Sequence, residues 1–186
     1  MSTKHLLAEE LHSIVDVFPA TPLTPETLDA FRRAGTENLV MGDPRRAGVV
    51  RSEIFAASAA GPDVRCLLYV PENNAEVRPG YLHVHGGGYV MGSPEGSDLM
   101  NLAIASKLGA VVVSVDYRLA PEHKYPAAPL DCYAATCWAA EHAGEFGATA
   151  NKLVVGGDSA GGCLAAVVSQ MARDKDGPEI AGQLLI

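Results

Sequence analysis

Residues 152–172 read KLVVGGDSAGGCLAAVVSQMA, an apolar run followed by glycines around one serine and then a helix-like stretch. Within it, GDSAG at residues 157–161 fits the pattern Gly-x-Ser-x-Gly, with a strand expected before it and a helix after it. Such a sharp turn forces the serine into strained backbone angles and lifts its Oγ above the sheet. Gly157 and Gly161 leave room for the turn because they have no side chains. The stretch therefore predicts an α/β fold with Ser159 as an exposed nucleophile.

The sequence on both sides of this stretch alternates between strand-like and helix-like segments. We expect strands over residues 81–85, 110–117, 152–157 and 182–186, separated by helices over residues 95–108, 127–143 and 160–174. Strands that alternate with helices of this length imply crossover connections and a mostly parallel central sheet with flanking helices. The uninterrupted valine runs suit strands that are covered on both faces.

The first third of the chain has a different pattern. Two amphipathic stretches come first and two β-type runs follow, at residues 3–17, 25–34, 49–57 and 64–71. The β-type runs are separated by AAGPD, which predicts a hairpin turn. A Gly/Pro/Arg-rich segment, GDPRRAG, marks a boundary near residue 45.

The composition excludes several classes of function. The 186 residues suffice for one domain with a sizeable core, and 14 Lys and Arg against 22 Asp and Glu give a net charge of -8. The basic residues are scattered, so we expect no nucleic-acid partner. The N-terminus has no apolar leader pattern and no stretch is long enough to span a bilayer, so we expect a cytoplasmic protein without a membrane span.

The four cysteines do not resemble metal ligands. Cys66, Cys132, Cys137 and Cys163 lie in apolar contexts, without Cys-x-x-Cys pairs or histidines at zinc spacing. We therefore expect buried, reduced thiols.

A second glycine-rich motif supports the serine. In YLHVHGGGYVMGS, His85 and three glycines, Gly86, Gly87 and Gly88, follow an expected strand. Glycines can turn two backbone N–H groups toward one point because no Cβ blocks the approach. Together with the N–H of Ala160 they would form an oxyanion hole with three donors, aided by the positive end of the helix that follows the serine.

Other interpretations of the two motifs fit the residues less well. A dinucleotide-binding loop would need glycine where Asp158 or Met91 stands, and a phosphate-binding loop would need Lys-Ser/Thr where the chain has Gly162-Cys163. His83 and His85 share a strand face, but no acidic or cysteine partner nearby would complete a zinc site. We expect neither metal nor cofactor.

With both motifs in place, the chain resembles the hormone-sensitive-lipase-like esterases of the α/β-hydrolases, which carry an HGGG loop and a GDSAGG elbow. A third segment, VDYRLAPEHKYPAAPLDCYAA at residues 115–135, also resembles this family. One departure is Ser97, where relatives often carry histidine. The resemblance implies a helical cap segment at residues 1–45 and an incomplete α/β-hydrolase domain at residues 46–186, truncated before the last strands.

The resemblance also implies roles for individual residues. Ser159 would be acylated, and the N–H groups of Gly87, Gly88 and Ala160 would hold the oxyanion. His85, Gly86 and Asp158 would support this arrangement, and Tyr89 would line the acyl or alcohol side. The implied substrates are small carboxylic esters of short to medium acyl length, and the full-length parent could form a homodimer.

The catalytic base is missing from the expected position. All six histidines precede Ser159, whereas the order in α/β-hydrolases is serine, acid, histidine. The acidic residues downstream, Asp174, Asp176 and Glu179, come too early for the triad acid and are expected to be solvated. An upstream substitute such as His85 or His123 is a minor alternative. We expect the acid and base beyond Ile186, and this chain to be nearly inert alone.

Three functions remain open from the sequence. The leading one is a serine carboxylesterase or lipase-like hydrolase, represented here by its N-terminal portion. An amidase or peptidase on the same fold is the second. The third is a non-catalytic ligand-binding protein that retains the hydrolase pocket.

Overall fold

Six strands form one sheet in the computed structural model, which describes residues 4–13, 22–72 and 77–186. The strands are β1 Val49–Ala56, β2 Val64–Pro71, β3 Arg78–Val84, β4 Val111–Val115, β5 Ala148–Gly157 and β6 Gly182–Leu185. The α-helices described are α2 Pro25–Glu37, α3 Pro44–Ala47, α4 Asp98–Leu108, α5 Ala127–Glu141 and α6 Ala160–Asp174. Short 3-10 helices are η1 Lys4–Leu6, η2 Glu9–Leu11, η3 Pro94–Ser97 and η4 Ala143–Phe146.

The sheet is mixed, with the strand order β1-β2-β4-β3-β5-β6. The β1–β2 and β2–β4 pairs are antiparallel, and β3 is parallel to both β4 and β5. The β5–β6 pair is also parallel, so the expected hairpin and the expected parallel half are both present. Every residue of β4, VVVSV, is buried, as expected for a strand covered on both faces.

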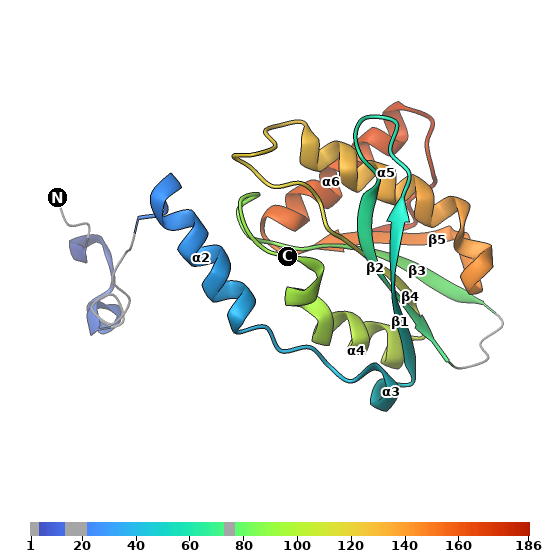
Figure 1. The fold of residues 1–186 in the computed structure, drawn as a ribbon, viewed down its shortest axis with the longest axis horizontal. Coiled ribbons are helices and arrows are strands. Elements are labelled where there is room, and N and C mark those ends of the chain that lie inside the picture. Colours follow the sequence, from blue (N-terminus) through green and yellow to red (C-terminus); the bar gives the residue numbers. More distant parts are fainter. Residues whose placement is uncertain (1–3, 14–21, 73–76) are drawn as a thin grey trace.

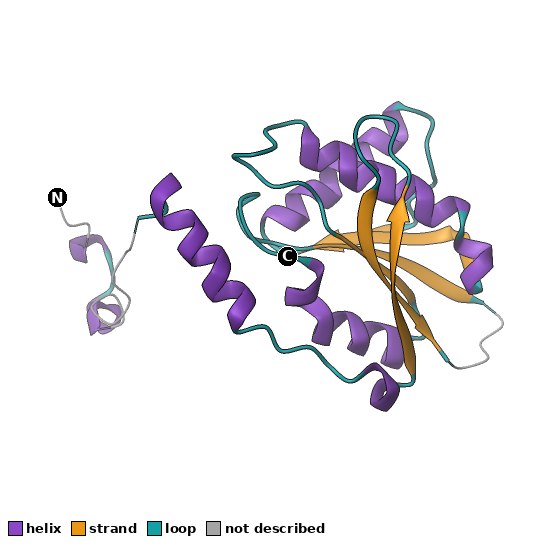
Figure 2. Cartoon of the chain, in the orientation of Figure 1, coloured by secondary structure: helices purple, strands orange, loops and turns teal. Residues whose placement is uncertain are grey.

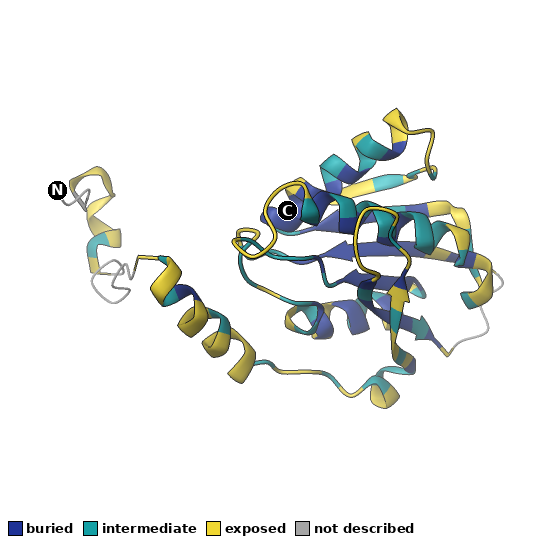
Figure 3. Ribbon diagram, turned by 45° about the horizontal axis from the view of Figure 1, so that its top comes forward, coloured by how far each residue is buried: buried dark blue, intermediate teal, exposed yellow. Residues whose placement is uncertain are grey.

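Helices cover the two faces of the sheet (Figures 1 and 2). On one face α5 and α6 pack over a core that includes Leu82, Val84 and Val155. On the other face α4 packs over a smaller core around Tyr69 and Val112. The centre of the sheet is dark in the burial view of Figure 3 and is therefore a rigid base for the loops at its edges.

The N-terminal region is mostly exposed (Figure 3). Thr24 caps α2 by accepting a hydrogen bond from the Thr27 N–H, and Pro25 occupies the first turn, as the sequence predicts. Leu28 is the one buried residue of α2. The described part of the expected 3–17 stretch contains the 3-10 helices η1 and η2, and residues 14–17 lie outside the described residues.

The predicted elements match the structure with small differences at their ends. The expected 95–108 helix begins as η3 and continues as α4, which Gly109 ends in a left-handed conformation. The expected 127–143 helix ends at Glu141, before η4. The boundary expected near residue 45 lies within α3, one turn before β1 begins at Val49.

Candidate active site

Two loops leave the same edge of the sheet. β3 and β5 are parallel neighbours, with Val84 opposite Gly157 at their carboxyl ends. The segments that follow these two residues must therefore begin side by side. We call residues 85–92 the glycine loop and residues 157–161 the elbow.

Ser159 has the backbone that the elbow predicts. Its φ is 52° and its ψ is -117°, a conformation that non-glycine residues seldom adopt, and its side chain is exposed. The Ser159 N–H donates to the Ile186 carbonyl at 2.6 Å, and the Ile186 N–H donates to the Gly157 carbonyl at 3.1 Å. The last residue of the chain thus holds the serine backbone in place.

The glycines of the elbow allow main-chain segments to touch. A Cβ on Gly157 or on Gly161 would overlap the carbonyl oxygen of Val84. A Cβ on Gly162 would come within 3.0 Å of the Gly157 carbonyl oxygen. These contacts bring the start of α6 directly against β3, which is why the sequence requires glycine here.

The glycine loop turns back on itself at Gly87. The N–H groups of Val90 and Met91 both donate to the Gly87 carbonyl, at 3.1 and 3.0 Å. Gly87 has a φ of 121°, and a Cβ there would overlap the Met91 carbonyl oxygen. Gly88 and Tyr89 follow with φ of 61° and 63°. Three successive positive φ values reverse the chain within a few residues, and only glycine fits the first position.

His85 is fixed at the base of the loop. Its ring stacks on Tyr117 with centroids 4.2 Å apart, and the Tyr117 hydroxyl donates to the His85 carbonyl at 2.9 Å. The His85 Nδ1 contacts the Gly86 carbonyl at 2.7 Å, which makes Nδ1 the protonated donor. Burial lowers the pKa of the His85 imidazole. The sequence did not single out Tyr117, although it lies two residues after the buried β4 strand.

The two loops touch through Gly86 and Asp158. A Cβ on Gly86 would overlap the Asp158 carboxylate and come within 2.9 Å of the Asp158 carbonyl oxygen. The residues expected to support the motifs are therefore in contact across the sheet edge.

Three backbone donors at this edge are unused. Among the residues that the structure describes, none accepts a hydrogen bond from the N–H of Gly87, Gly88 or Ala160. The Ser159 N–H, by contrast, is engaged by Ile186. Ala160 is the first residue of α6, so its N–H belongs to the positive end of that helix. This set of donors suits a developing negative charge near Ser159.

A hollow lies on each side of the glycine loop. One, of about 410 Å³, is lined by Gly88, Tyr89, Cys163, Leu164 and other residues of the loop after β4 and of α6. The other, of about 460 Å³, is lined by Gly87, Met91 and residues of α2. Both are large enough for part of a small organic molecule.

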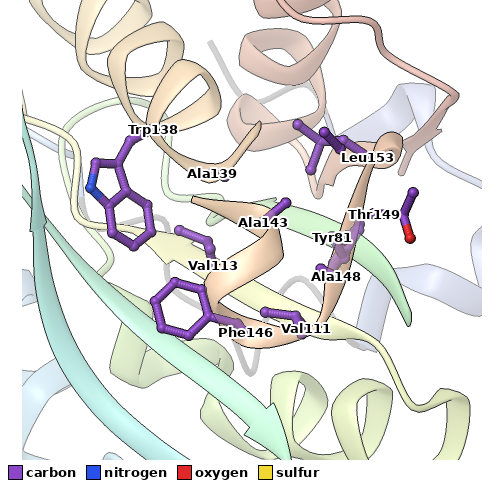
Figure 4. A pocket seen from close by; sticks show the side chains of 12 residues that line it. Tyr81, Val111, Val113, Trp138, Ala139, Ala143, Phe146, Ala148, Thr149 and Leu153 are labelled. Carbon is purple, nitrogen blue, oxygen red and sulfur yellow. The ribbon is translucent and has the colours of Figure 1, made fainter. Parts of the chain in front are cut away.

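A third cavity does not fit a substrate (Figure 4). It has a volume of about 20 Å³ and lies between apolar side chains such as Trp138 and Phe146. That volume holds little more than one water molecule. Its lining includes Gly80, early in β3, so it lies away from the elbow at the end of β5.

The expectation for the cysteines is partly wrong. Cys66 and Cys132 are buried and Cys137 is half-buried, but Cys163 is exposed. The apolar sequence around Cys163 suggested burial, whereas Cys163 lies in the first turn of α6 and lines the hollow of about 410 Å³ beside Gly88. All four are free thiols.

Neither upstream histidine acts as a partner of Ser159 here. His85 is engaged by Gly86 and Tyr117, and no hydrogen bond joins it to Ser159. His123 is exposed and lines the hollow beside Gly88 without a bond to Ser159. The acidic residues Asp174, Asp176 and Glu179 are exposed at the end of α6 and beyond it.

Within residues 4–13, 22–72 and 77–186, no group of three or more His, Cys, Asp or Glu side chains is arranged to hold a metal ion. His83 instead contacts the Ser114 hydroxyl at 3.0 Å, and burial lowers the pKa of its imidazole to about 4. No helix in these same ranges has the length and apolar character needed to cross a bilayer.

Arg32 of α2 is a site neighbour that the sequence did not indicate. Its guanidinium donates to the Val90 and Ala120 carbonyls at 2.7 and 2.9 Å, and it pairs with Glu122. A single arginine on an exposed amphipathic helix gives no sequence signal of such contacts, which cross 58 and 88 residues of chain.

Comparison with known proteins agrees with this geometry. A family profile described as alpha/beta hydrolase fold matches residues 81–186, which include the glycine loop and the elbow. The structure titled Bacterial Heroin Esterase superposes with a TM-score of 0.82 and 34% identity, covering 98% of this chain and 58% of that one. The chain therefore belongs to the α/β-hydrolase fold family.

Its relatives place it more narrowly, in the hormone-sensitive-lipase-like esterase branch. Carboxylesterase NlhH of Mycobacterium tuberculosis is 44% identical over 176 residues, covering 94% of this chain and 54% of that protein. Esterase LipI of the same organism is 54% identical over 107 residues, covering 58% of this chain and 33% of that protein. Hormone-sensitive lipase of Bos taurus is 38% identical over 112 residues, covering 60% of this chain and 15% of that protein. The chain thus spans about half the length of the relatives that it matches most fully, such as NlhH.

Proposed function

We propose that this chain is the nucleophile-bearing part of a serine carboxylesterase that acts on small esters. The observation that carries the proposal is Ser159 itself, exposed at a left-handed φ of 52° where two parallel strands end. A serine in this conformation is strained, and strain of this kind persists at sites where it serves the chemistry. Several relatives named as esterases support the same activity.

In the proposed reaction, the Ser159 Oγ attacks the ester carbonyl carbon while a base accepts the hydroxyl proton. The carbonyl oxygen gains negative charge and accepts hydrogen bonds from the N–H groups of Gly87, Gly88 and Ala160. The tetrahedral intermediate then expels the alcohol, which takes the proton from the base. A water molecule then gives a proton to the same base and attacks the acyl carbon. The bond from that carbon to the Ser159 Oγ breaks, Oγ takes the proton back from the base, and the carboxylic acid leaves.

The proposal assigns the base and its acid to a longer form of the protein. No hydrogen bond joins His85 or His123 to Ser159, and the relatives are about twice as long as this chain. Loss of the base from a serine hydrolase reduces turnover by on the order of 10⁶, while about 10³–10⁴ over water remains from the oxyanion hole and binding. The 186 residues alone should therefore hydrolyse esters very slowly.

Hydrolysis of p-nitrophenyl butyrate, together with labelling by a fluorophosphonate, tests the proposal. In a form of the protein that turns over the ester, Ser159→Ala should reduce kcat by about 10⁶ and abolish labelling. Ser169→Ala, on the same helix, is the matched control and should leave both unchanged. Near-full turnover by the 186-residue chain would disprove the assignment of the base. Ligand binding without labelling would favour a non-catalytic binding protein.

A further inference from the structure

Arg32 joins the N-terminal helix to both loops that border the site. Its Nε donates to the Val90 carbonyl at 2.7 Å, in the glycine loop. One terminal nitrogen, Nη2, donates to the Ala120 carbonyl at 2.9 Å. Ala120 belongs to residues 118–126, which we call the proline loop. We propose that Arg32 is a positioning residue for the oxyanion hole, an inference that rests on the proposed esterase function.

The two loops are already joined at the point that Arg32 holds. The Ala120 N–H donates to the Tyr89 carbonyl at 2.9 Å, so the proline loop and the glycine loop form one unit there. Arg32 accordingly holds two successive carbonyls of the glycine loop, that of Val90 directly and that of Tyr89 through Ala120.

This unit determines where the unused donors point. The Val90 and Met91 N–H groups close the turn onto the Gly87 carbonyl, which shares its peptide plane with the Gly88 N–H, and the Gly87 N–H lies one peptide before it. Glycines with positive φ have many accessible conformations and do not hold a turn by themselves. An external contact at Val90 therefore limits the conformations that would swing the two N–H groups away from Ser159.

The geometry requires the guanidinium fork of arginine. Arg32 uses Nε and both terminal nitrogens at once, because Nη1 and Nη2 also donate to the two oxygens of Glu122 at 2.7 and 2.9 Å. Its side chain is 24% exposed, and that of Glu122 is 52% exposed. The Arg32 pairing lowers the pKa of the Glu122 carboxyl to about 2. Exposed ion pairs contribute little to stability, so Glu122 mainly orients the fork while the two carbonyl contacts hold the loops.

A lysine could not replace this arrangement. Its single ammonium can keep the charge, but it lacks the planar set of donors that reaches two carbonyls and a carboxylate together. Arg32→Lys therefore separates positioning from charge. If Arg32 acted on the oxyanion through its charge, lysine would preserve the effect. If it acts through position, Arg32→Lys and Arg32→Ala should have similar effects.

Hydrogen exchange in the 186-residue chain tests the positioning directly, without requiring activity. In Arg32→Ala and Arg32→Lys, the amides of Val90, Met91 and Ala120 should exchange about tenfold faster or more, because the loops open more often. Amides of β4 should not change. Arg33→Ala, the exposed neighbour on α2, is the matched control and should leave all of these rates unchanged. Unchanged exchange at Val90, Met91 and Ala120 in Arg32→Ala would overturn the proposal.

Ester hydrolysis in a catalytically complete form of the protein gives the second measurement. Arg32→Ala should lower kcat by about tenfold or more and change KM by less than about twofold, because the lost interaction acts in the transition state. A role limited to anchoring α2, which lines one hollow, would instead raise KM at constant kcat. That result would overturn the proposal. An ester activity that survives Ser159→Ala would instead disprove the proposed function, and the role of Arg32 would then be decided by hydrogen exchange alone.

Discussion

The elbow and the glycine loop meet at the same sheet edge but are held there by different forces. The elbow is enclosed by main-chain atoms, since a Cβ on Gly157 or Gly161 would overlap the Val84 carbonyl. The glycine loop is held by hydrogen bonds, a stacked histidine and one arginine from a distant helix. Close packing tolerates almost no change in volume, whereas hydrogen-bonded loops respond to protonation and to single side chains. The Ser159 backbone therefore lies in a sterically enclosed turn, whereas the N–H groups of Gly87 and Gly88 lie in a loop held by polar contacts.

The largest effect should come from adding one methyl group to the elbow. Gly161→Ala places a Cβ against the Val84 carbonyl, and neither main chain can move without displacing β3 or α6. We expect a loss of about 3 kcal/mol or more in the free energy of unfolding, measured with urea. Gly144→Ala is the control, because nothing lies within 4 Å of its added Cβ, and it should change stability by less than about 0.5 kcal/mol. Equal stability of the two variants would contradict the steric account of the elbow.

Acid should destabilise the folded chain through its buried histidines, His83 and His85. The buried His83 on β3 has a pKa lowered to about 4, compared with about 6.5 in the unfolded chain. Between these values the unfolded state binds more protons than the folded state, so stability falls as the pH falls. From pH 7 to pH 5 the protonation of His83 should lower the free energy of unfolding by about 2 kcal/mol. The lowered pKa of the buried His85 acts in the same direction.

Urea unfolding at both pH values measures this contribution. His83→Gln should show a smaller loss of stability on acidification than the parent chain does. His123→Gln removes an exposed histidine and should keep the parent dependence. The same pH dependence in all three proteins would show that His83 does not couple protonation to folding.

The smallest effect on stability is expected at Cys163, in the first turn of α6 directly after the elbow. Cys163 is exposed, whereas Cys66 and Cys132 are buried and burial raises the pKa of both thiols, that of Cys66 to about 12. Iodoacetamide should therefore modify Cys163 well before Cys66 or Cys132 in the folded protein, as read by peptide mass spectrometry. Cys163→Ser should change the free energy of unfolding by less than about 0.5 kcal/mol. Simultaneous modification of all three thiols would mean that the core opens more easily than its packing implies.

The sequence predicted the local features of the site well. The strained backbone of Ser159 was predicted because it depends on a short motif, in which neighbouring residues determine the backbone. The order of strands and helices was also predictable, because the apolar pattern that indicates each element lies within its own segment of the sequence. The predictions that concern chemistry, above all the roles of Ser159 and of the donors, await the experiments described above.

Features formed across long distances in the chain were not predictable. Arg32 reaches Val90 across 58 residues, and Tyr117 reaches His85 across 32. Neither contact leaves a pattern in its own segment, because the partners are main-chain carbonyls, which every residue has. Cys163 was placed wrongly for a related reason. Its neighbours are apolar, but its exposure depends on the direction in which the elbow starts α6.

The hydrogen bonds between Ile186, which directly follows β6, and the elbow connect Ser159 to the register of that strand. The Ile186 carbonyl oxygen accepts a hydrogen bond from the Ser159 N–H, and the Ile186 N–H donates to the Gly157 carbonyl on the other side of Asp158. A slip of β6 by one residue would remove both bonds at once. Substitutions that alter how β6 aligns with β5, although they touch no substrate, would thus release the serine from its strained conformation.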